Sequence, residues 1–139
     1  MPSQLRAIAA LLVMVAWNAT AESAEKAQAG AIVQSGYERF IDSCALCHGL
    51  GARGDGEAAG MLEKAPPDLT QLSKNNEGRF PLEYVYTTID GRAAMQPHGN
   101  REMPVWGNLW TRSVPPEYAE AYARSRALEL IMFLESIQE

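Results

Sequence analysis

Two cysteines and a histidine stand close together in this chain in a pattern that is typical of cofactor attachment. Cys44 and Cys47 are the only cysteines, and His48 directly follows the second of them. A Cys-x-x-Cys-His run is the attachment signature of c-type haem, in which each thiol adds across a vinyl group of the porphyrin. The adjacent histidine then binds the iron from one side. The run therefore predicts one covalently bound haem c per chain, with His48 as an axial ligand.

Three other kinds of site use the same residue types, and each fits less well. Thiol-disulfide exchange proteins place their Cys-x-x-Cys at the start of a helix after a strand, and no strand pattern precedes Cys44. A zinc site would need His48 and His98, the only histidines, but adjacent Cys47 and His48 are poorly placed to point at one small ion. A disulfide across so short a loop would be strained. Haem attachment is the favoured interpretation.

The opposite side of the iron needs a second donor, for which five downstream side chains are candidates. Met103 is followed by Pro104, which removes a backbone donor and holds the next residues extended, as suits a strap across a haem face. It lies about 55 residues after His48, which is enough chain to pass round a haem. Packing is the simpler interpretation for two of the methionines. The candidates are Met61, Met95, His98, Met103 and Met132.

The elements that must position these residues are predicted to be helical. Apolar residues recur at three- and four-residue steps up to Cys44, and Gly36 within this pattern indicates that another helix crosses closely. Four glycines in residues 49–56 predict a tight loop that wraps the haem edge. Residues 81–89 fit either a strand or a helix, and helix is favoured because a lone strand has no partner. Residues 116–138 predict one or two further helices.

The N-terminus resembles an export signal. A single arginine, an apolar run and a small-x-small site predict a signal peptide over residues 1–21, a loose extension over 22–30 and one domain over 31–139. Export would place the protein in the periplasm, with no stable membrane insertion after cleavage. The formal net charge of −5 argues against nucleic acid or an anionic membrane surface as a partner and allows a partner with a basic patch.

Over nearly all of its length after the leader, the chain resembles a class I, or monohaem, c-type cytochrome. That family combines a glycine and an aromatic before Cys-x-x-Cys-His-Gly, a proline-containing loop, a Met-Pro strap and a final helix. The matching residues here are Gly36, Phe40, Cys44, Cys47, His48, Gly49, Pro66, Pro67, Met103, Pro104, Trp106, Gly107 and Phe133. The resemblance implies an all-α cytochrome c fold of about four to five helices around one haem, with the N- and C-terminal helices crossing.

The resemblance also implies roles for individual residues. His48 and Met103 become the two axial ligands, with His98 or Met95 as the alternative on the second side. A carbonyl of the Pro66–Pro67 segment would accept the free N–H of His48. Arg92 and Trp106 are candidates to bond the haem propionates.

Iron held on both sides exchanges one electron and little else, so the expected function is electron transfer rather than enzymatic turnover. The expected partners are redox proteins, such as a dehydrogenase or membrane complex and a terminal acceptor. Two alternatives stay open. One is a haem enzyme or gas sensor whose second axial ligand is labile, and the other is a dedicated cytochrome subunit of a periplasmic dehydrogenase.

Overall fold

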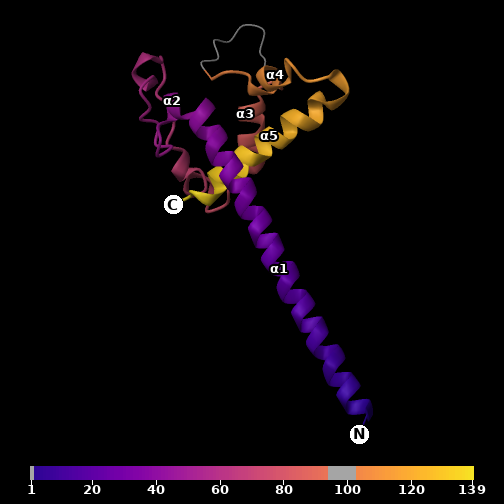
Figure 1. Ribbon diagram of the computed structural model, residues 1–139. Helices are drawn as coiled ribbons and strands as arrows, with labels where there is room; N and C mark the ends of the chain where they lie inside the picture. The colour runs from indigo at the N-terminus through magenta and orange to yellow at the C-terminus, as the bar shows by residue number, and fades with distance from the viewer. Residues whose placement is uncertain (1, 94–102) are drawn as a thin grey trace. The chain divides into compact units, whose positions relative to one another are not determined.

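The computed structural model describes residues 2–93 and 103–139, with side chains described from residue 22 onward. Within these ranges, helix is the only regular secondary structure (Figure 1). The all-α class predicted from the sequence is therefore confirmed. The chain divides into two units, Met1–Ile32 and Val33–Glu139.

The first helix, α1, spans Pro2–Ser43 and belongs to both units. Residues 22–30, for which a loose extension was predicted, are helical, and their side chains are exposed. Alanine-rich sequence favours helix there, and Lys26 Nζ pairs with Glu22 Oε1 at 2.7 Å. In the described part of the chain, no helix is both long enough and apolar enough to span a membrane.

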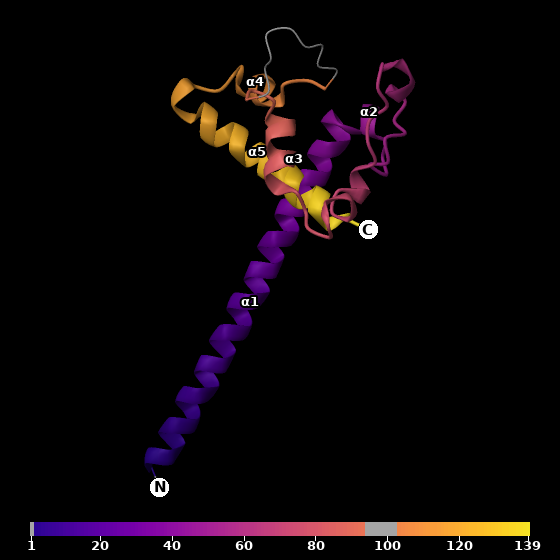
Figure 2. The same ribbon diagram turned by 180° about the vertical axis from the view of Figure 1, so that it is seen from behind.

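The last helix, α5, spans Pro116–Ser136 without interruption and crosses α1 at Gly36 (Figures 1 and 2). A Cβ atom at Gly36 would overlap the backbone carbonyl of Glu129, lying 2.7 Å from its carbon and 2.9 Å from Phe133 Cβ. The rings of Phe40 and Phe133 meet nearby, with centroids 5.2 Å apart. The helix crossing predicted from Gly36 is thus present, and the glycine permits it.

An ion pair also joins these two helices. Arg39 donates to Glu129 Oε2 from Nη2 at 2.8 Å and from Nε at 2.9 Å. Arg126, one turn before Glu129 on α5, donates to the same oxygen at 3.1 Å. The Arg39 and Glu129 side chains are only 21% and 20% exposed, so the pair is shielded from water more than an ordinary surface pair.

The third helix, α3, spans Leu82–Asp90 and packs against α5. It is a helix rather than the alternative strand. Gly91, at a φ of 73°, ends it by donating its N–H to Thr87 O at 3.0 Å. Val85 and Ile89 enter the core from α3. The largest fully buried side chains of the described core are Phe40, Leu130 and Ile131.

Short elements complete the second unit. A one-turn helix, α2, spans Ala45–His48, and α4 spans Trp106–Thr111 and packs on α3 and α5. Three 3-10 turns lie between α2 and α3, at Ala59–Met61 (η1), Leu69–Gln71 (η2) and Lys74–Asn76 (η3). The end of the chain closes on η2, because Glu139 N donates to Thr70 O at 3.0 Å.

Candidate functional site

The helical turn at the end of α1 places the two thiols and the imidazole on one side. The Cys44 carbonyl accepts from Cys47 N at 3.1 Å and from His48 N at 2.9 Å, which makes this segment a single turn. With about 3.6 residues per turn, Cys44, Cys47 and His48 share one face, and the spacer residues Ala45 and Leu46 take the other. Both cysteines are free and partly buried. This is the arrangement that attachment of one flat group through two thiols requires.

Burial governs the chemistry of the first thiol. It raises the pKa of Cys44 to about 12, and the neighbouring Cys47 acts in the same direction, while Arg39 opposes them. The Cys44 thiol therefore keeps its proton near neutral pH and is a poor nucleophile in this setting. The electropositive, exposed environment of a catalytic cysteine is absent around Cys44.

His48 is held in its neutral form. Burial lowers the pKa of the ring, and a contact with the backbone carbonyl of Pro67 opposes the shift only in part. Nδ1 is buried and makes no well-formed hydrogen bond within the described residues. A neutral imidazole next to one backbone carbonyl has the tautomer fixed on that side and leaves its other nitrogen available to a metal. The carbonyl beside the ring is that of Pro67, one residue on from the Pro66 candidate.

The glycine-rich loop packs against protein backbone on two sides. Gly54 N donates to His48 O at 2.8 Å, and Gly56 N donates to Cys47 O at 3.2 Å. A Cβ atom at Gly54 would overlap the Pro66 carbonyl, and one at Gly56 would lie 2.6 Å from the Cys47 carbonyl carbon. The loop therefore fixes the attachment turn against the Pro66–Pro67 segment. Its glycines are explained by these backbone contacts, whereas the sequence indicated a close approach to the haem edge.

Met103 lies on the strap that precedes α4 and packs partly buried against the hydrophobic core. Cys44 contacts the same core cluster, so the attachment turn and the strap share one apolar support. Met61, by contrast, is 81% exposed at the end of η1 and does not pack, which corrects the expectation that it fills the core. The alternative ligands Met95 and His98 lie outside the described residues.

The two candidate propionate partners contact other protein groups. Arg92 is bound by two carboxylates, with Nη2 donating to Asp90 Oδ2 at 2.6 Å and Nη1 lying 2.9 Å from Glu120 Oε2. Trp106 is half-buried, and its ring stacks with that of Trp110 at a centroid distance of 6.0 Å. Sequence reasoning missed Asp90, for which the available signal was an acidic residue two positions before an arginine, across the glycine that ends α3.

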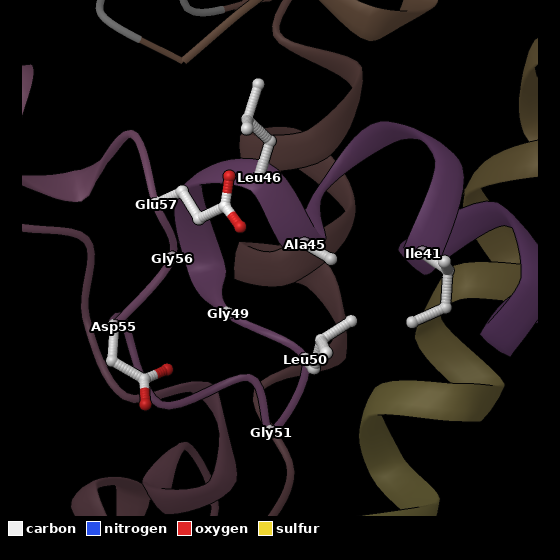
Figure 3. A pocket seen from close by; sticks show the side chains of 9 residues that line it. All are labelled: Ile41, Ala45, Leu46, Gly49, Leu50, Gly51, Asp55, Gly56 and Glu57. Atoms are coloured by element: carbon white, nitrogen blue, oxygen red, sulfur yellow. The ribbon is translucent and has the colours of Figure 1, made fainter.

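A surface pocket of about 520 Å³ lies beside the attachment turn (Figure 3). Figure 3 shows Asp55 and Glu57 on one side of it and Ile41 and Leu50 on the other. The remaining lining residues are Ala45, Leu46, Gly49, Gly51 and Gly56. Because the spacer residues of the Cys-x-x-Cys-His run line this pocket and the thiols and His48 do not, it lies on the opposite face from the attachment side chains.

Side chains that would favour a zinc site do not gather in the described ranges. No group of three or more histidine, cysteine or acidic side chains there is arranged to hold a metal ion. Comparison of the chain with protein-family models, curated proteins and solved structures finds no match. The chemistry of the site follows from its own residues: two free thiols and a neutral imidazole on one face of a turn, and a thioether on the strap.

Proposed function

We propose that this protein is an exported one-electron carrier that holds one covalent haem c with His48 and Met103 as axial ligands. The observation that carries the proposal is the attachment turn. Two free thiols and a buried, neutral imidazole occupy one face of a single helical turn, with the Pro67 carbonyl beside the ring. Thioether attachment and axial ligation need these groups in this arrangement.

The residues around this turn fit such a group. Cys44 and Cys47 would hold the porphyrin edge as thioethers, and the loop glycines would keep the turn pressed against the proline segment. The Pro67 carbonyl would accept the Nδ1 proton of His48, fix the ring orientation and make the ligating nitrogen more basic. Met103 would supply a thioether from the strap, supported by the same core that Cys44 contacts.

Ligation on both sides supports electron transfer over catalysis. The bound haem would take up and release one electron at its iron. With His48 and Met103 in place, the chain would leave no open position for a small substrate. A thioether donor and apolar surroundings disfavour the ferric charge, and both raise the reduction potential. The helix crossing at Gly36, just before the attachment turn, supports a cytochrome c fold around this site.

The setting in the cell follows from the leader. We infer delivery to the periplasm by residues 1–21, and redox proteins as donor and acceptor. The acidic balance of the chain favours partners with a basic contact surface.

The absorption spectrum of the purified, oxidised protein tests the proposal. A weak far-red band from methionine sulfur on ferric iron is expected in the native protein and in the His98→Ala variant. Met103→Ala should lose the band. Met61→Ala is the matched control, because Met61 is exposed and removed from the strap, and it should keep the band.

Two results would contradict the carrier. A high-spin spectrum that shifts readily with carbon monoxide or cyanide would indicate a haem enzyme or gas sensor. Loss of the band only in the His98→Ala variant would refute the Met103 assignment. Stable co-purification with a dehydrogenase would replace a free carrier with a dedicated subunit.

A further inference from the structure

A buried carboxylate and an arginine form a tightly bonded pair at the end of α3. Asp90 is 5% exposed. Arg92 donates to both of its oxygens, from Nε to Oδ1 at 2.8 Å and from Nη2 to Oδ2 at 2.6 Å. The backbone N–H of Arg92 adds a bond to Oδ1 at 3.1 Å. A buried carboxylate is stable only with such partners, so the pair holds one geometry rather than several.

The pair lies beneath the first turn of α4. A Cβ atom at Gly107 would lie 2.6 Å from Arg92 Nε and 2.8 Å from Asp90 Oδ2. No side chain larger than hydrogen fits there without moving the pair. Arg92 also reaches Glu120 on α5, with Nη1 2.9 Å from Oε2, so the guanidinium joins α3, α4 and α5. These bonds raise the pKa of Arg92 further above its usual range, Asp90 contributing most.

This junction supports the residue proposed as the second ligand. Met103 lies three residues before the start of α4, with Pro104 restricting the backbone between them. The position of the first turn of α4 therefore sets where the strap can hold the Met103 sulfur. If the pair is broken, α4 loses the surface on which Gly107 rests.

We propose that Asp90 and Arg92 are positioning residues for Met103, acting through Gly107 and the first turn of α4. This inference rests on the proposed function, since it assigns a role in holding the axial ligand. The pair does not touch the iron or the haem. It keeps the strap in the one position from which the thioether reaches the iron, and so limits replacement of Met103 by competing ligands.

The test compares three variants of the full chain with the native protein. Asp90→Asn removes the charge and keeps the shape, and Gly107→Ala places a methyl group on the pair. Glu129→Gln is the control, because it breaks the Arg39 pair between α1 and α5 and leaves the α4 junction intact. One readout is amide hydrogen exchange over Trp106–Thr111, and the other is the affinity of the ferric protein for added imidazole.

In Asp90→Asn and Gly107→Ala, exchange over α4 should be about tenfold faster and imidazole should bind about tenfold more tightly, the effect of losing one charge-assisted hydrogen bond. Glu129→Gln should change neither quantity in this region. Unchanged exchange would overturn the anchoring of α4, and faster exchange with unchanged imidazole affinity would overturn the positioning role. Failure of the proposed function would be seen separately, as a missing far-red band in the native protein.

Discussion

Replacing Gly36 by alanine tests the helix crossing, because two effects of opposite sign compete at this position. In an isolated helix, alanine is favoured over glycine by about 1 kcal/mol. Here the added methyl group would lie 2.7 Å from the Glu129 carbonyl carbon and 2.9 Å from Phe133 Cβ. The sign of the stability change therefore reports whether α5 contacts α1 at this residue.

The expected size follows from these distances. Neither neighbour can yield locally, because one is helix backbone and the other is the first atom of a buried side chain. The helices would have to separate by roughly 1 Å, which loosens the contact of Phe40 with Phe133 and strains the Arg39–Glu129 pair. Overpacking of this kind costs up to about 3 kcal/mol. After subtracting the gain in helix propensity, we expect Gly36→Ala to lose about 2 kcal/mol of unfolding free energy.

Urea unfolding followed by far-ultraviolet circular dichroism measures this change, provided that the dependence on urea stays the same. Gly30→Ala is the matched control, because Gly30 lies on the same helix with no atom near its would-be Cβ. It should leave the unfolding free energy unchanged or raise it by up to about 1 kcal/mol. If Gly36→Ala proves as stable as the native protein, or more stable, the close crossing at this residue is wrong.

Three further predictions follow. Glu129→Gln should lower the unfolding free energy by about 1–3 kcal/mol in the same assay, since it leaves Arg39 half-buried without its carboxylate, and no loss would mean that water replaces the pair. In the chain without haem, the unfolding free energy should fall as pH is lowered from 6.5, because the lowered pKa of His48 makes the unfolded ring protonate first; unfolding curves at several pH values check this, and His48→Gln should remove the dependence. In that same chain, iodoacetamide should label Cys44 slowly near neutral pH, because its pKa is about 12, and labelling as fast as in urea would refute its burial.

The features predicted correctly from the sequence are those that depend on neighbours along the chain. Pro81 before the apolar face of α3 and Gly91 after it are local signals of a helix start and stop, and both hold. Gly36 is a less direct case. A glycine that costs helix stability on an apolar face indicated a close neighbour, and α5 is that neighbour.

The features missed depend on contacts that no local pattern encodes. Asp90 reads as the polar end of a helix, and only the packing of α4 over Gly107 shows that its carboxylate is buried and bonded to Arg92. The loop glycines likewise signal a close approach without naming what approaches. For Gly54 it is the Pro66 carbonyl, which comes from a segment more than ten residues away.

The short reach of the contacts around the attachment turn has a consequence for the order of folding. The loop returns to Leu46, Cys47 and His48 through hydrogen bonds that span about a dozen residues or fewer, and such short loops close quickly and at low entropic cost. The strap that bears Met103 depends instead on α3 and on α5, which is completed only near the end of the chain. A chain emerging from its N-terminus would thus present its two thiols and His48 in nearly final form while the support for the opposite ligand is still unmade.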